Sequence, residues 1–248
     1  MLLHHQTWGE VERYLGGASG IVMPIGSTEQ HGPNGLIGTD AITAEAIGRA
    51  VGEAVGAMVG PTIGVGMAQH HMAFTGSMTL RPSTLIAVID DYVTSLARHG
   101  FRRFYFVNGH GGNIATVGAA FNEIYARLSL AEPGANRPDV RCKLANWWQG
   151  DGIPKLSKEL FGDKEGSHAT PSEVSVTQFL HPETIKPVGP MTVAPKGGFH
   201  DAADYRRRFP DGRIGSDPSL ASPAAGKRVF DRAVAELVED YRKFIAEP

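Results

Sequence analysis

The sequence has a single cysteine, no long hydrophobic run and no block of like charge. Cys142 has no second cysteine for an intramolecular disulfide and lies in no CxxC motif, which favours a reducing compartment. Nowhere do about 18 apolar residues stand together, and the first residues lack the basic and apolar regions of a signal peptide, so we expect a cytoplasmic protein with no membrane partner. With a formal net charge of −2, the chain also lacks the electrostatic signature of a nucleic-acid binder.

The composition is otherwise that of an ordinary globular protein. A chain of 248 residues with 42% hydrophobic residues can bury a substantial core, and we expect a single domain over residues 1–248. The 31 glycines are the unusual feature. They cluster around histidines and acidic residues, as glycines do where a site sets the backbone conformation.

Predicted strands alternate with predicted helices along the first part of the chain. The strands cover 19–26, 57–63, 101–108 and 140–148, and the helices cover the stretch from Asp40, with Thr39 or Asp40 as its cap, then 82–99, 113–130 and a final 224–245. The stretch 182–222 is rich in proline, glycine and aspartate and is expected to be irregular. The alternation predicts a parallel sheet with helices on both faces, whose ligands bind beyond the carboxyl ends of the strands.

The first loop after a predicted strand carries a carboxylate, an imidazole and a second carboxylate. Glu29 and His31 are two residues apart and can point the same way in an extended segment, and Asp40 returns at the start of the helix. This mixture of oxygen and nitrogen ligands suits zinc, manganese or iron better than magnesium or calcium. Each residue also has a simpler interpretation: a solvated glutamate, a buried and hydrogen-bonded histidine, and a helix cap.

A second histidine stands between the clearest strand and the clearest helix, in Asn108-Gly-His110-Gly-Gly-Asn113. This is where a doubly wound fold places functional groups, so His110 should project into the same rim. The glycines could instead form a phosphate-binding turn. Both the GxGxxG and the GxxxxGK[ST] fingerprints are missing, which disfavours a nucleotide-binding protein.

Further ligand-type residues follow in Gly166-Ser-His168-Ala-Thr-Pro-Ser-Glu173 and in the pair His70 and His71. Glu173 could simply favour the dipole of a helix that begins near Pro171, and adjacent histidines can be surface residues. No serine lies in a GxSxG motif, so water is the better candidate for the nucleophile. Two metal ions can share and activate such a water.

Together these segments resemble the creatininase (creatinine amidohydrolase) family over nearly the whole chain. The matching segments are MPIGSTEQHGPNGLIGTD, HHMAFTGSMTL, FVNGHGGN, HATPSEVS and GRIGSDPSLASPAAG. The resemblance implies a three-layer αβα sandwich around a mostly parallel sheet, two divalent metal ions and a homo-oligomer, with a hexamer suspected. It also implies metal ligands with Asp40 as the bridge, namely Glu29, His31, Asp40, His110 and Glu173.

One position departs from that family. Creatininase proper has a metal-binding glutamate two residues after the histidine of its NGH motif, where this sequence has Gly112, so the ligand role passes to Glu173 and creatinine is disfavoured as substrate. Trp147 and Trp148 fall where the family places an aromatic lid and could stack on a planar amide. They could equally be ordinary core residues.

The leading hypothesis is therefore an enzyme that hydrolyses a C–N bond of a small cyclic or formyl amide through a metal-bridging hydroxide. Zinc is the first choice of metal, with manganese or iron as alternatives. His168 is expected to donate a proton to the leaving nitrogen, and His71 and the two tryptophans are expected to contact the substrate. Two alternatives are a hydrolase of another small cyclic or peptide substrate, and a metal-stabilised binding or assembly protein without catalysis.

Overall fold

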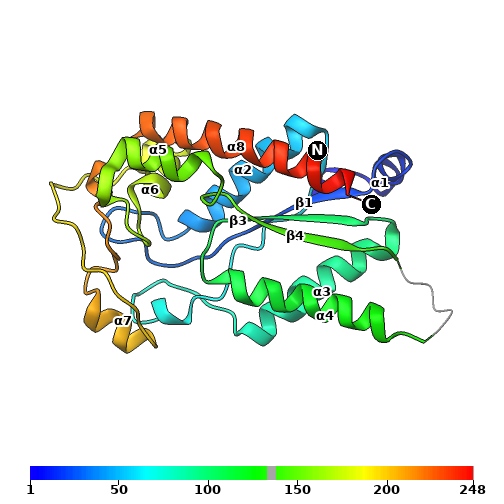
Figure 1. Ribbon diagram of the computed structural model, residues 1–248, viewed down its shortest axis with the longest axis horizontal. Coiled ribbons are helices and arrows are strands. Elements are labelled where there is room, and N and C mark those ends of the chain that lie inside the picture. Colours follow the sequence, from blue (N-terminus) through cyan, green and yellow to red (C-terminus); the bar gives the residue numbers. More distant parts are fainter. Residues whose placement is uncertain (133–137, 248) are drawn as a thin grey trace.

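A four-stranded parallel sheet forms the centre of the computed structural model, which describes residues 1–132 and 138–247 (Figure 1). Its strands are β1 (Gly20–Ile25), β2 (Met58–Val59), β3 (Arg103–Asn108) and β4 (Arg141–Asn146). The spatial order is β2-β1-β3-β4, and every neighbouring pair is parallel. The predicted α/β class with a parallel sheet is confirmed.

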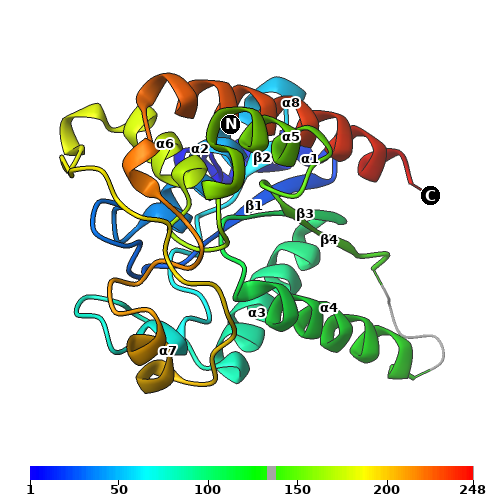
Figure 2. The same ribbon diagram turned by 60° about the vertical axis from the view of Figure 1, so that its left-hand side comes forward.

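Helices cover both faces of this sheet, which completes the predicted αβα sandwich. In Figures 1 and 2, α3 and α4 lie on one face, and α2, α5, α6 and α8 lie on the other. The helices are α1 (Trp8–Leu15), α2 (Thr39–Val55), α3 (Pro82–His99), α4 (Asn113–Leu130), α5 (Gly152–Phe161), α6 (Pro171–Leu180), α7 (Ala202–Arg208) and α8 (Pro223–Ala246).

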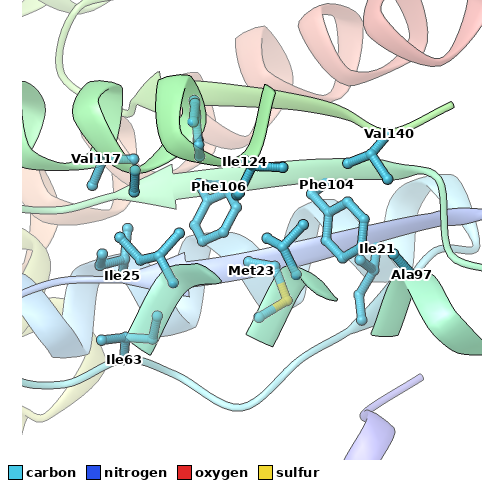
Figure 3. Close-up of a cluster of buried hydrophobic side chains, with 14 of the residues drawn as sticks. Ile21, Met23, Ile25, Ile63, Ala97, Phe104, Phe106, Val117, Ile124 and Val140 are labelled. Atoms are coloured by element: carbon cyan, nitrogen blue, oxygen red, sulfur yellow. The ribbon is translucent and has the colours of Figure 1, made fainter. Parts of the chain in front are cut away.

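The strands alternate their side chains between two hydrophobic cores. Ile21, Met23 and Phe106 are fully buried and pack with side chains of α3 and α4, as the close-up in Figure 3 shows for part of this cluster. Val22 and Tyr105 point the opposite way and pack with α2 and α8. Since each fully buried large apolar side chain contributes about 1.5–3 kcal/mol, the two cores hold the strand ends in fixed positions.

The boundaries of α3 and α4 agree with the sequence patterns. Pro82 occupies the first turn of α3, where its missing N–H is not needed, and Gly100 ends the helix with a φ of 119°. α4 runs over the predicted 113–130. Local signals therefore mark both ends of α3.

The predicted side-chain cap of α2 is wrong. The residue before the helix is Gly38, and neither Thr39 nor Asp40 caps it through a side chain. The Thr39 hydroxyl donates to the carbonyl of Leu36 instead. Asp40 lies inside the first turn, and its carboxylate faces His31 of the preceding loop and His110 of the loop after β3.

Other expectations needed correction. The strand expected over 57–63 is regular only at Met58–Val59, because Pro61 has no N–H for the ladder, although Ile63 still bridges to Ile25. The 182–222 stretch contains α7, and neither α1 nor α5 was expected. None of the helices in residues 1–132 and 138–247 is long and apolar enough to cross a membrane.

Candidate metal centre

The candidate site lies where the chain leaves the carboxyl ends of the strands. The loop after β1 carries Glu29 and His31 and leads to Asp40 in the first turn of α2, while the loop after β3 carries His110. All four side chains are buried. A Cβ at Gly109 would overlap the backbone carbonyl of Asp40, so glycine is what lets these two loops meet. The rim expected from the order of strands and helices is confirmed.

Three ligand atoms converge at one position, from Glu29, Asp40 and His110. His110 Nδ1 lies 3.2 Å from Glu29 Oε1 and 3.0 Å from Asp40 Oδ2. His110 Nε2 is 3.0 Å from the carbonyl oxygen of Met67, which can only accept, so a neutral His110 carries its proton on this nitrogen and leaves Nδ1 as the ligand atom. Neither carboxylate oxygen accepts a hydrogen bond with good geometry from any residue that the structure describes. These three buried ligand atoms face one another, so a cation could bind among them in place of the His110 proton.

A second group of three is formed by His31, Asp40 and Glu173. His31 Nε2 lies 2.9 Å from Asp40 Oδ1 and 3.9 Å from Glu173 Oε1. His31 Nδ1 is 3.1 Å from the backbone carbonyl of Glu29, so it donates there and leaves Nε2 as the ligand atom. Asp40 thus offers one oxygen to each group. The arrangement fits two ions that share Asp40.

The charges of this cluster depend on one another. Burial raises the pKa of Glu29, but His110 and His71 outweigh it and hold that pKa well below its usual value. Burial lowers the pKa of His31, but the Asp40 carboxylate and then Glu173 raise it to about 10. Without a metal, protons on the imidazoles therefore balance the carboxylates. Divalent cations would replace those protons, because ligands must be deprotonated to bind metal.

Glu173 has two roles in the structure. Its Oε1 accepts from the backbone N–H of Thr170 at 2.6 Å, and Thr170 Oγ1 accepts from the N–H of Glu173, which closes a capping box at the start of α6. The simpler interpretation of Glu173 as a helix-start residue is thus confirmed. The same oxygen faces His31, and burial raises the pKa of Glu173 to about 7, with His31 opposing this shift and Asp40 adding to it.

His168 precedes α6, as expected from the position of Pro171. Ala169 has a positive φ of 51°, which turns the chain between His168 and the start of the helix. The His168 ring lies 4.7 Å from that of His31 and 4.5 Å from that of His71, and its Nδ1 is 3.9 Å from Glu29 Oε1. Burial, together with the neighbouring His71 and His31, lowers the pKa of His168 well below its usual value, so it is neutral near pH 7.

A cavity of about 470 Å³ opens over the two groups of ligand atoms. Asp40, His110 and Glu173 lie at its wall, together with His168, and both Trp147 and Trp148 line it. Its volume is in the range of small-molecule sites. Trp147 is only 2% exposed and also packs in the core, so both interpretations of the tryptophans apply to it.

His70 and His71 are both buried, so the interpretation of these adjacent histidines as surface residues is wrong. Burial and His71 lower the pKa of His70 to about 4. His71 Nε2 lies 3.1 Å from Glu29 Oε1, and neither histidine is among the residues that line the cavity. Contact of His71 with a substrate stays a prediction, since His71 lies beside Glu29 and does not line the cavity.

The sequence patterns did not identify two further residues at this site. Gln30 contacts His71 and His168 through its amide, and Tyr205 of α7 lies beside that amide. Gln30 stands inside the first motif, but a glutamine has no characteristic spacing. Tyr205 lies in the stretch that was expected to be irregular, so its burial against the histidines could not be anticipated.

Gly112 leaves no space for a side chain in this backbone. A Cβ there would overlap Nε2 of His110 and the carbonyl of Met67. A glutamate at this position would therefore displace the hydrogen bond that orients His110. The carboxylate that faces His31 beside Asp40 is that of Glu173.

The model of the family described as creatinine amidohydrolase matches residues 4–241. The chain belongs to the creatininase family of hydrolases. A mycofactocin precursor peptide peptidase of Mycobacterium ulcerans (strain Agy99) is 30% identical over 229 residues, which cover 89% of this chain and 82% of that protein.

Solved creatininase structures share the fold. One described as "Creatininase Mn" superposes with a TM-score of 0.86 at 23% identity, and a creatininase variant described as "Zn-Zn type" superposes with a TM-score of 0.79 at 24% identity. The first match covers 99% of both chains, and the second covers 99% of this chain and 98% of the other. The whole creatininase-like architecture is therefore present here.

Proposed function

We propose that this creatininase-family hydrolase cleaves a C–N amide bond with the help of two divalent metal ions. The observation that carries the proposal is the pair of ligand groups that share Asp40. Glu29 and His110 complete one group, and His31 and Glu173 complete the other. Both groups stand at the wall of a cavity large enough for a small molecule.

The chemistry of the donors supports zinc, with manganese or iron as alternatives. Carboxylate oxygens and imidazole nitrogens together suit these metals, whereas magnesium and calcium prefer oxygen alone. Two relatives with the same fold are named for manganese and for a zinc pair. When bound, such ions polarise a carbonyl group and lower the pKa of water.

The protein itself would supply orientation and proton transfer. His168 is neutral and lies at the cavity wall with Nδ1 3.9 Å from Glu29 Oε1, so it can exchange a proton with the reacting groups. Trp147 and Trp148 offer flat apolar walls against which a small amide can stack. His168 could alternatively hold a metal, since it forms a third group with Glu29 and His31.

This arrangement favours an enzyme over a metal-stabilised binding or assembly protein. A purely structural site is usually closed by four ligands, whereas each group here has three ligands beside an open cavity. We also propose a single domain over residues 1–248 and a cytoplasmic homo-oligomer, with a hexamer as the expected state.

The substrate is proposed to be a small cyclic or formyl amide other than creatinine, because Gly112 replaces the glutamate of creatininase proper. A peptide is the second candidate. The observation in its favour is the 30% identity to a mycofactocin precursor peptide peptidase, which exceeds the identity to the solved creatininases.

A substrate panel tests the proposal. Zinc- and manganese-loaded protein would be incubated with cyclic amides, formamides, creatinine and short peptides, and amine release would be measured against an Asp40→Asn control. Cleavage of any C–N bond that requires metal and Asp40 supports the proposal. Metal-loaded protein that cleaves none of these classes would favour the non-catalytic alternative.

A further inference from the structure

The side chain of Gln30 lies between His71 and His168, the two histidines whose other ring nitrogens face Glu29. Its Nε2 is 2.9 Å from His71 Nδ1 and 2.9 Å from His168 Nε2. Gln30 is only 8% exposed, so these contacts are shielded from water. In such a setting each hydrogen must go to a definite acceptor, because an unsatisfied buried polar group is costly.

Two backbone groups fix the orientation of the Gln30 amide. Oε1 accepts from the N–H of Gly32 at 2.9 Å, and Nε2 donates to the carbonyl oxygen of Gly212 at 3.0 Å. Exchanging the two ends of the amide would set oxygen against oxygen and N–H against N–H. The atom between the two histidines is therefore the nitrogen, which donates two hydrogens and accepts none.

The remaining hydrogens can be placed in only one satisfactory way. His168 Nε2 lies 2.9 Å from the backbone carbonyl oxygen of Gln30, which only accepts, so His168 carries its proton on Nε2 and donates it there. His168 Nε2 then cannot accept from the amide. One amide hydrogen goes to Gly212, and the other goes to His71 Nδ1. The hydroxyl of Tyr205, at 3.4 Å, is more distant from this nitrogen than the two histidines and Gly212 are, and it donates to the Gly212 carbonyl itself.

We propose that Gln30 is a positioning residue that fixes the tautomers of both histidines. Its side chain keeps the proton of His71 on Nε2, the atom 3.1 Å from Glu29 Oε1. Its backbone carbonyl keeps the proton of His168 on Nε2, so the free lone pair of His168 is on Nδ1, the atom 3.9 Å from Glu29 Oε1. One residue thus determines that a protonated nitrogen of His71 and an unprotonated nitrogen of His168 face the proposed metal ligand Glu29.

This inference deepens the proposed function and, for its chemical consequence, rests on it. In the resting state His168 can only take up a proton at Nδ1, so it acts first as a base. The attacking water gives one proton to Nδ1 as its oxygen bonds to the amide carbon. The same proton then passes to the leaving nitrogen as the C–N bond breaks. The Nε2 proton stays on the Gln30 carbonyl throughout.

The tautomers can be measured without any substrate. Long-range ¹H–¹⁵N correlation spectra of zinc-loaded protein labelled with ¹⁵N-histidine distinguish protonated from unprotonated ring nitrogens, and His71→Gln and His168→Gln spectra assign the signals. We expect Nδ1 unprotonated and Nε2 protonated in both rings. A proton on Nδ1 of either ring, or zinc bound to Nδ1 of His168, would overturn the proposal.

Substitutions of Gln30 separate positioning from a merely structural role. In Gln30→Glu the new carboxylate accepts from His71, whose Nδ1 should gain a proton, whereas His168 should keep its tautomer because the backbone carbonyl remains. Gln30→Met removes the donor and should leave His71 without a single tautomer, and it serves if the glutamate variant does not fold. Gln69→Glu adds the same charge at an exposed position and is the control.

An unchanged His71 signal in both Gln30 variants would refute the role of the side chain. Because none of these spectra requires turnover, failure of this inference and failure of the proposed hydrolysis are distinguishable.

Discussion

Replacing Asp40 by alanine should weaken both metal sites at once. One carboxylate oxygen of Asp40 lies 3.0 Å from His110 Nδ1, and the other lies 2.9 Å from His31 Nε2. A zinc site with four ligands binds with about 10–16 kcal/mol, so a single ligand is worth roughly 2.5–4 kcal/mol. Since about 1.4 kcal/mol corresponds to a tenfold change, each site should lose roughly 100- to 1000-fold in affinity.

The assay is a zinc titration against a chelator of known affinity, followed by elemental analysis. Glu173→Ala is the informative comparison, because it should weaken only the site that contains His31. Asp40→Asn keeps the shape of the first turn of α2 and checks that lost charge, not a damaged helix, causes the effect. Asp91→Ala, at an exposed position of α3, is the matched control. If Asp40→Ala retained two ions at the affinity of the unaltered protein, or lost no more than Glu173→Ala, the shared role of Asp40 would be wrong.

Three other predictions address catalysis and pH. His168→Ala should lower kcat on a verified substrate by about 10²- to 10⁴-fold with metal content unchanged, and a loss of metal instead would make His168 a ligand. Creatinine should be turned over much more slowly than another small amide or a peptide, and steady-state rates on purified metal-loaded protein decide this. Because the carboxylates raise the pKa of His31 to about 10, protons compete with metal for it at neutral pH. Apparent zinc affinity should therefore rise by about tenfold per pH unit for each proton displaced between pH 6 and 9, and a flat profile in the chelator titration would contradict this.

Much of the fold could be predicted because local and long-range signals agree in the elements nearest the centre. β1 and β3 are apolar runs followed by glycine-rich loops, and α4 begins and ends where the pattern predicts. The same strand-to-helix order placed the loops of Glu29, His31 and His110 on one rim, since parallel strands present their carboxyl ends together. The carboxylate and imidazole side chains on that rim then indicated a metal site.

The remaining features depend on partners that a local pattern cannot show. Asp40 resembles a helix cap in sequence, but its carboxylate instead contacts His31 of the preceding loop and His110 of the loop after β3. α7 has the sequence AADYRRR, whose one large apolar residue, Tyr205, is buried against the histidines and Phe209. The role of Gln30 depends on four neighbours that lie far away in the sequence.

The stoichiometry and position of bound metal test the central claim most directly. Protein purified without chelator would be analysed for its metals and crystallised, and anomalous scattering would locate each ion. The account predicts two divalent ions per chain, one held by Glu29, Asp40 and His110 and the other by His31, Asp40 and Glu173. A metal content near zero, or a single ion that does not touch Asp40, would contradict it.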